Sequence, residues 1–237
     1  TDSWSCQAAD TVIVNVFQVF ANAGTDVDIC NGESTLLTAT GGASYEWSTG
    51  LTTDNITVSP TSDTNYFVTV TGINSCTDVD TVSVIVHALP NASAGSDEDI
   101  CTGNSVTLTA TGGVSYAWNS GQNTDAITVS PTLNTEYIVS VTDAFGCENS
   151  DTVNVIVHAL PNANAGPDIN ICFGESANLN ASGGTDYVWN SGQLVAGITV
   201  SPSATTEYIV SVTDFWSCQA ADTVVVNVFQ VFANAGT

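Results

Sequence analysis

The chain contains no lysine, no arginine and no methionine, whereas it has 24 acidic residues and a formal charge of −24 at pH 7. A nucleic-acid-binding surface needs cations that displace the counterions of phosphates, and this chain has none. Docking on an anionic membrane surface fails for the same reason. No apolar run approaches the roughly 18 residues of a membrane-spanning helix. We therefore expect no nucleic-acid partner and no membrane insertion in this segment.

Sequence motifs of catalysis are also missing. The chain has no GxSxG, HExxH or Walker sequence, and its only histidines are His87 and His158. Both precede "ALP" at equivalent positions, where two other copies of the segment have Phe17 and Phe229. We interpret this position as an aromatic filler and expect neither enzymatic activity nor a required cofactor.

The residues that are abundant favour an ordered all-β fold. Hydrophobic residues make up 43% of the chain, and the β-branched and aromatic types among them suit pleated strands. Apolar and polar residues alternate in 105–111, 135–142 and 152–158, which is typical of strands with one buried face. Gly-Gly, Ser-Gly and Ser-Pro pairs between them indicate turns, and no window has a helical period. Short strands at this density predict small antiparallel β-sandwiches.

Internal repeats divide the chain. "GGASYEWSTG" (41–50), "GGVSYAWNSG" (112–121) and "GGTDYVWNSG" (183–192) recur about every 71 residues. We predict three β-sandwich modules, at 23–93, 94–164 and 165–237. Residues 1–22 match only the last third of a module, and we interpret them as the C-terminal part of a preceding module.

A longer period lies above the single module. Residues 1–25 and 213–237 differ at only two positions, and Trp4 and Trp216 occupy the same place in the two segments. Both segments carry the tail "VNVFQVFANAG", which is one residue shorter than the tails of the first two modules. We therefore predict a 212-residue super-repeat of three modules and interpret the chain as part of a longer periodic protein.

Cysteines recur once near the start and once in a hairpin of every module, about 46 residues apart. A domain of this size has a small core and needs such a covalent link. We predict that each module closes one disulfide, and that Cys6 is unpaired because its partner lies upstream. Zinc is a poorer alternative, since CxxC pairs and nearby histidines are missing. Disulfides predict an extracellular or cell-surface location. The predicted pairs are Cys30–Cys76, Cys101–Cys147 and Cys172–Cys218.

The pattern C-x-G…LTATGG…Y-x-W…VSP…T-x-Y-x-V-x-V-T…GC…DTV resembles the PKD-like and Ig-like repeats of large Bacteroidota surface proteins. These include gliding-motility adhesins and other proteins exported by type IX secretion. The resemblance covers all three modules. Such modules serve as stalks, adhesive arms and spacers, so it implies a tandem Ig-like array at the cell surface rather than one particular activity.

Acidic residues at the start of each module are the candidate metal ligands. Carboxylates at a junction, together with backbone carbonyls, suit calcium, which would stiffen the array. The alternative is that they are solvated surface charges. The candidates are Asp26, Asp28, Asp97, Glu98, Asp99 and Asp168.

The tripeptide "DTV" opens the last strand of every copy, at 10–12, 80–82, 151–153 and 222–224. Asp-Thr before an aliphatic residue resembles the O-glycosylation acceptor of Bacteroidota, which would make this a glycoprotein. The alternative is a polar turn that leads into a strand. The candidate acceptors are Thr11, Thr81, Thr152 and Thr223.

The segment "VFQVF" (16–20 and 228–232) replaces a proline-containing linker at one junction in three. Its phenylalanines either pack on the linker or form a lateral contact between neighbouring filaments or subunits. The residues concerned are Phe17, Phe20, Phe229 and Phe232.

Together these patterns predict a structural segment of a long secreted fibre or adhesin stalk, whose partners are copies of itself along or beside the fibre. The alternative is a set of modules that bind surface glycans or proteins through the loops 49–55, 120–126 and 191–197. A third hypothesis is that residues 1–22 donate a strand to a neighbouring subunit. It is less favoured because the third module has its own final strand at 222–231.

Overall fold

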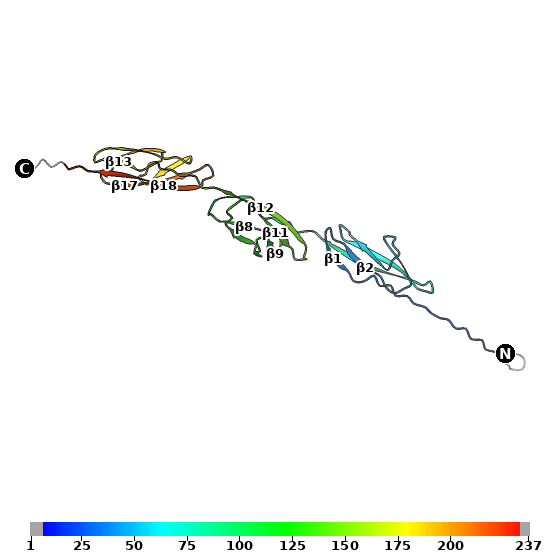
Figure 1. Ribbon diagram of the computed structural model, residues 1–237. Coiled ribbons are helices and arrows are strands. Elements are labelled where there is room, and N and C mark those ends of the chain that lie inside the picture. The colour runs from blue at the N-terminus through cyan, green and yellow to red at the C-terminus, as the bar shows by residue number, and fades with distance from the viewer. Residues whose placement is uncertain (1–6, 233–237) are drawn as a thin grey trace, which may run out of the picture. The chain divides into compact units, whose positions relative to one another are not determined.

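The structure is a computed structural model that describes residues 7–232. These residues form strands and no helix, as the alternating pattern predicts (Figure 1). In particular, none of them belongs to a helix long and apolar enough to span a membrane. The first set of six strands is β1 Val27–Cys30, β2 Thr35–Thr38, β3 Ser44–Trp47, β4 Asn55–Val58, β5 Thr64–Thr71 and β6 Thr77–His87.

The same order of strands follows twice more along the chain. The second set is β7 Glu98–Cys101, β8 Val106–Thr109, β9 Ser115–Trp118, β10 Ala126–Val129, β11 Thr135–Thr142 and β12 Glu148–His158. The third set is β13 Ile169–Cys172, β14 Ala177–Asn180, β15 Asp186–Trp189, β16 Gly197–Val200, β17 Thr206–Thr213 and β18 Gln219–Phe229.

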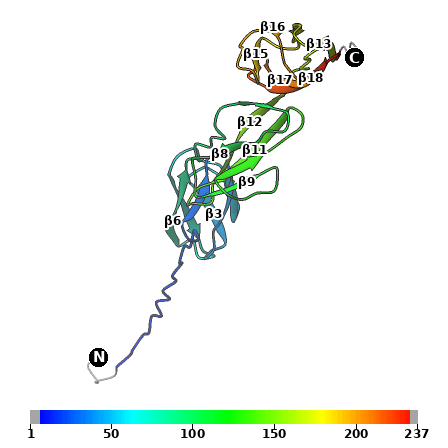
Figure 2. The ribbon, with the colours of Figure 1, turned by 90° about the vertical axis from the view of Figure 1, so that its left-hand side faces the viewer.

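Each set builds an Ig-like sandwich from a four-stranded and a two-stranded sheet. In the first module the larger sheet has the order β1-β6-β5-β3, and β2 pairs with β4 in the smaller one. Figure 2 shows the two layers in the third module, where β16 lies across from β17 and β18. Within the first module all pairings are antiparallel with one exception. The first strand runs parallel to the last, so that Val27 lies opposite Val84 and Cys30 opposite His87.

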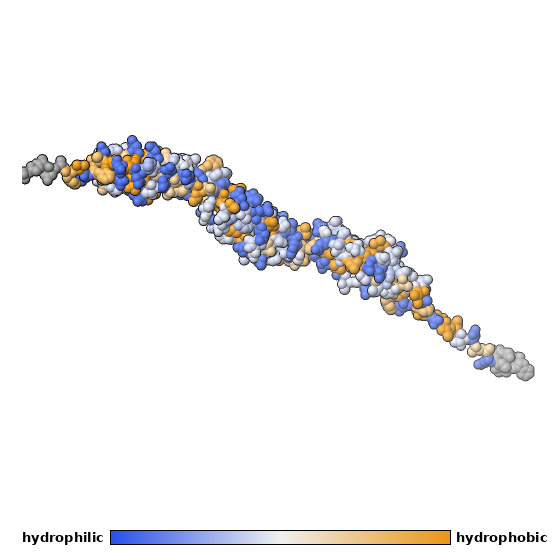
Figure 3. Space-filling model, viewed as in Figure 1, coloured by the Kyte–Doolittle hydropathy of each residue, from blue (hydrophilic) through white to orange (hydrophobic). Residues whose placement is uncertain are grey.

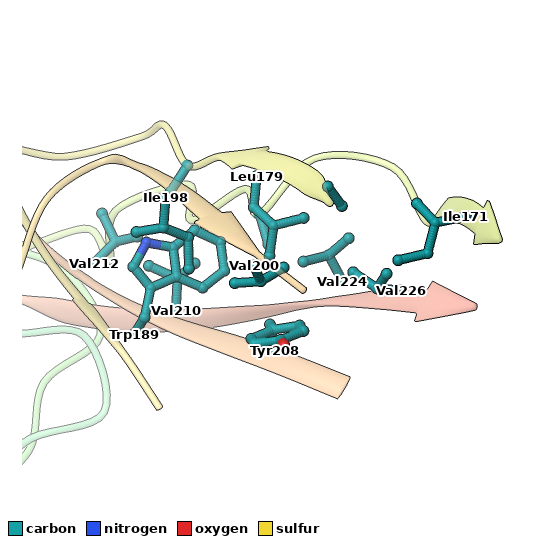
Figure 4. Close-up of a cluster of buried hydrophobic side chains, with 13 residues drawn as sticks. Ile171, Leu179, Trp189, Ile198, Val200, Tyr208, Val210, Val212, Val224 and Val226 are labelled. Atoms are coloured by element: carbon teal, nitrogen blue, oxygen red, sulfur yellow. The ribbon is translucent and has the colours of Figure 1, made fainter. Parts of the chain in front are cut away.

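The core of each module lies between its two sheets. Val210, Val212 and Val224 of the larger sheet are fully buried and face Leu179 and Ile198 of the smaller one (Figure 4). The alternation of these side chains along β17 and β18 is the reason that this sequence forms strands with one buried face.

A tryptophan completes each core. Trp189 is 1% exposed, and its indole N–H donates to the carbonyl of Val195 at 3.0 Å. Trp47 and Trp118 donate to the carbonyls of Thr53 and Thr124 in the same way. The ring therefore fills the core while its polar atom keeps a partner, as a buried tryptophan requires.

The paired glycines are turns on which the incoming linker rests. Gly183 has φ +110°, and a Cβ at this position would meet the backbone of Asn162, whose carbonyl carbon would be only 2.7 Å away. The linker is fixed there by mutual backbone hydrogen bonds between Asn164 and Ser182. Gly41 has φ +108° and meets the backbone of Phe20 in the same manner. Glycine is therefore required both for conformation and for close approach of the linker.

Two compact units can be described, and they do not follow the repeat. Among the described residues, 7–91 form one unit together with Thr142–Asn149, and 92–141 together with 150–232 form the second. A hairpin of the second module thus belongs to the unit of the first module.

We predict that Gly183→Ala destabilises the third module more than Gly192→Ala does. Both glycines have a positive φ, so alanine is strained at either position, but a Cβ at Gly192 meets no atom within 4 Å. We expect about 1–2 kcal/mol for Gly192→Ala and at least ~1 kcal/mol more for Gly183→Ala, which must also push the linker away. Hydrogen exchange of the β17 amides measures both, and equal losses would contradict the role of the linker contact.

Candidate functional site: the disulfide junction

The disulfides join successive modules. Cys30 is bonded to Cys147 and Cys101 to Cys218, each pair 117 residues apart in sequence with a Cα–Cα distance of 5.5 Å. The prediction that each module closes its own disulfide is therefore wrong. Of the cysteines in the described residues, Cys76 and Cys172 form no disulfide. Cys6, which we predict to be unpaired, lies outside the described residues.

The direction of the first strand explains the error. Because β1 is parallel to β6, Cys30 lies beside His87 at the end of β6, whereas Cys76 directly precedes its start at Thr77. The length of β6 separates the two cysteines, which is about 33 Å at ~3.3 Å per residue. A disulfide requires Cα atoms less than about 7 Å apart. The cysteine that ends β1 therefore reaches the hairpin of the next module and not its own.

Beside the first disulfide, a histidine contacts both modules. The His87 ring stacks on Phe145 with 3.9 Å between ring centroids and 12° between the planes. Its Nε2 lies 2.7 Å from Oδ1 of Asp28. The interpretation of His87 as an aromatic filler accounts for the stacking but misses the carboxylate. The ring links the first module to the hairpin of the second.

The second junction repeats this arrangement with different residues. His158 stacks on Trp216 at 4.0 Å and 12°, and its Nε2 lies 2.6 Å from Oδ1 of Asp99. Phe215 packs against Trp216 edge to face. Recurrence of the same contacts at both junctions shows that the histidine, the carboxylate and the aromatic ring belong to one repeated geometry within this chain.

An aspartate shapes each hairpin that receives the disulfide. Oδ1 of Asp143 accepts hydrogen bonds from the backbone N–H groups of Phe145 and Cys147, at 2.8 and 2.9 Å. Asp214 does the same for Trp216 and Cys218. This local turn presents the aromatic ring and the cysteine together. The sequence signal is Asp-x-aromatic-[Gly/Ser]-Cys, in "DAFGC" and "DFWSC", which motif analysis missed.

Five of the six acidic residues proposed as calcium ligands have partners within the protein. Asp28 and Asp99 contact the two histidines. Three more each accept a backbone N–H at 2.8 Å, namely Asp26 from Ser83, Asp97 from Asn154 and Asp168 from Val225. Among the described residues, no group of three His, Cys, Asp or Glu side chains could hold a metal ion. Calcium binding by these residues and Glu98 stays a prediction.

The aspartate of the "DTV" motif has a structural role. Oδ2 of Asp222 accepts the N–H of Ala165 at 2.8 Å, and Asp80 and Asp151 hold Ala23 and Ala94 in the same way. These bonds tie the incoming linker to the last strand. The hydrogen bond from the backbone of Ala165, followed by that from Thr223, lowers the pKa of Asp222. The bonds from Ala94 and Thr152 lower the pKa of Asp151.

The threonines of the same motif lie at the surface of the protein. Thr11, Thr81, Thr152 and Thr223 are all exposed. Their O-glycosylation stays a prediction. The phenylalanines of "VFQVF" are also exposed, from 55% for Phe17 to 81% for Phe232. Their lateral contact with another filament or subunit stays a prediction as well.

We predict that Cys147→Ser leaves Cys30 as a free thiol and leaves Cys101 bonded to Cys218. Loss of a link that closes a 117-residue loop removes about 5 kcal/mol in the chain-entropy model. Alkylation under denaturing conditions, followed by peptide mapping, identifies the thiol. The matched control is Cys76→Ser, which should leave both disulfides intact. A free Cys30 thiol in that control would show instead that Cys30 pairs with Cys76, within one module.

We predict that Asp222→Asn weakens the third module at neutral pH and has little effect in acid. A carboxylate with a lowered pKa stabilises the fold above the ordinary range of aspartate, near pH 4, and this contribution is lost as pH falls through the folded pKa. Unfolding midpoints of both proteins at pH 7 and pH 2 provide the test. A gap of the same size at both pH values would show that the charge contributes nothing.

No protein-family model matches the chain, and no curated protein sequence matches it. Among solved structures, it is similar to the I-band fragment I67–I69 of titin, with 12% identity, a TM-score of 0.41 and coverage of 90% of this chain and all of that one. It is also similar to the three N-terminal domains of the bacteriophage RB49 outer capsid protein Hoc, with 15% identity, a TM-score of 0.38 and coverage of 89% and 98%. For immunoglobulin domains 1–4 of Sidekick-1 the identity is 13%, the TM-score 0.32 and the coverage 89% and 76%.

Proposed function

We propose that this chain is a load-bearing segment of a long secreted cell-surface fibre or adhesin stalk, built from a 212-residue super-repeat. Its role is mechanical rather than catalytic. The observation that carries the proposal is that both disulfides link one module to the next. The bonds also support an extracellular location, because disulfides persist in oxidising compartments. We assign the fibre to the type IX-secreted surface proteins of Bacteroidota on the motifs quoted above.

The disulfides shorten the covalent path through the modules. Along the backbone, roughly 140 residues separate Cys30 from Cys172, which is about 500 Å of stretched chain. Through the bond from Cys30 to Cys147, the path needs only the roughly 25 residues from Cys147 to Cys172. Had each module closed its own disulfide, the same path would contain two such stretches, one for each linker. The staggered pairing therefore halves the length that force could draw out.

The short path is largely extended already. It contains β12, which has 11 residues, and β13, which has four. Fully stretched, roughly 25 residues span at most about 90 Å, so little slack is left once the strands are counted. A force that unfolds the second module is carried by this path and by the backbone of its neighbours. Such an array would hold its length under tension even after a module opens.

Charge supports an extended fibre. All the acidic residues repel one another, and no lysine or arginine is present to pair with them. Uniform negative charge keeps modules soluble and disfavours folding back of one module on another, within the Debye length of about 8 Å at physiological ionic strength.

We predict that the oxidised chain resists extension between Asn31 and Phe173. With handles attached there through non-canonical amino acids, single-molecule pulling should end at about 95 Å when oxidised and about 500 Å when reduced, at ~3.5 Å per residue. Cysteine handles are unsuitable because the chain has free thiols. The difference reports directly on the length of the covalent path.

The control for this experiment is Cys147→Ser, which keeps the bond between Cys101 and Cys218. We expect its oxidised extension to rise to roughly 400 Å at ~3.5 Å per residue. In the unsubstituted chain, an end point of about 180 Å, the length of two linkers at ~3.5 Å per residue, would indicate closure within modules. An end point equal to that of the reduced chain would refute a load-bearing role for the disulfides.

A further inference from the structure

A groove of about 360 Å³ lies beside the unpaired Cys76. It is lined by residues 17–19, by the turn 41–43 and by the hairpin 72–76. The sulfur of Cys76 lies 3.7 Å from the carbonyl oxygen of Phe17. In the other two modules the equivalent cysteines, Cys147 and Cys218, are 0% exposed and bonded. The groove therefore corresponds to the surface beside Cys147 and Cys218, which contacts the preceding module at the two complete junctions.

The segment beside this groove, residues 14–17, lies outside any strand and pairs with no strand among the described residues. Residues 14–17 correspond to 226–229, which pair in parallel with β13, so that Phe229 lies opposite Cys172. Val14 and Val16 are 77% and 87% exposed, whereas Val226, the counterpart of Val14, is 0% exposed. Figure 3 shows hydrophobic residues along this N-terminal segment. A parallel strand added here would place its last residue beside Phe17 and therefore next to Cys76.

We propose that Cys76 and the groove beside it are the receiving half of a third junction, and that the occupant is a preceding module with the sequence of the third module, whose last strand contains residues 14–17. Its first strand, with the sequence of β13, pairs with residues 14–17, and its terminal cysteine forms a disulfide with Cys76. Two thiols lose two protons and two electrons to form this bond, and a low-molecular-weight disulfide such as oxidised glutathione takes them up to become two thiols.

The hairpin at this junction has smaller side chains than the hairpins at the other two junctions. The hairpin has Gly72 and Asn74 where the second module has Asp143 and Phe145. A Cβ at Gly72 would meet the side chain of Val19 at 2.6 Å, so the small residue keeps the wall of the groove in place. On the other side, Phe17 occupies the position of the histidine and is 55% exposed, and Phe229 in the third module is similarly exposed, at 58%.

The third junction therefore has no histidine–carboxylate contact. Asn170 stands where the first two modules have Asp28 and Asp99, and its side chain contacts Asn227 at 3.1 Å. In a module with the sequence of the third, phenylalanine and asparagine replace the histidine and the aspartate, and they face a hairpin of the first module that has no aromatic ring. This match favours pairing of such a module with the hairpin of the first module over pairing with the other two hairpins. Every super-repeat would contain two histidine junctions and one apolar junction.

The chain's own repeat provides the test. Because residues 213–237 repeat 1–25 with two differences, residues 165–212 placed directly before Thr1 complete a preceding module without new sequence. The original Cys172 is replaced by serine, so that the only cysteine with this sequence context is the copy of Cys172 in the added segment. We expect Cys76 to be alkylated by N-ethylmaleimide in the present chain but protected in the extended one. A peptide that links the added cysteine to Cys76 should appear after Asp-N digestion.

The matched control replaces the added cysteine with serine, which should return Cys76 to full alkylation. A bond between the added cysteine and Cys6 would mean closure within one module and would overturn the proposal. So would an extended chain in which Cys76 stays fully reactive. Neither result depends on the pulling experiment, so the junction and the mechanical role can fail separately.

Discussion

The parallel pairing of the first strand with the last determines how these modules are connected. It sets Cys30 opposite His87, at the far end of β6 from Cys76. The cysteine at the end of the first strand and the cysteine in the hairpin of the same module are thereby held apart by the length of the last strand, so they cannot form a disulfide with each other. Every module consequently offers one cysteine at each end, and tandem order brings each into reach of a neighbour. The stacked ring and the carboxylate beside His87 depend on the same register, because β1 also carries Asp28.

Much of the fold could be predicted from alternation. The expected strand 135–142 coincides with β11, and Leu108 and Ala110 are buried as their shared face requires. The direction of β1 could not be predicted, since alternation is the same for parallel and antiparallel strands. The cysteine spacing was equally ambiguous, because one head and one hairpin cysteine in every repeat fit pairing within a module or between neighbours. The "DTV" tripeptide predicts O-glycosylation of its threonines, which stays a prediction, but it gives no sign that the aspartate carboxylates hold the linker.

Two kinds of contact act on each linker, and they have different ranges. Hydrogen bonds to Asp222 and with Ser182 fix a few residues of the linker to the module that follows it. The disulfide instead constrains 117 residues of the unfolded chain. The first kind fixes the linker locally, whereas the second keeps modules together after local contacts are lost. A module of this size has a small core, so the second kind matters most when force or heat opens it.

We expect staggered pairing to make internal modules more stable than terminal ones. The second module is held through Cys101 to the third and through Cys147 to the first, in addition to the backbone at both ends. If it unfolds alone, its chain gains less conformational entropy than a module that is held by the backbone only. A terminal module has one such bond and gains more. Stability in the array therefore comes from neighbours as well as from each core, and it should rise from the ends toward the interior, as in repeat proteins whose modules depend on adjacent copies.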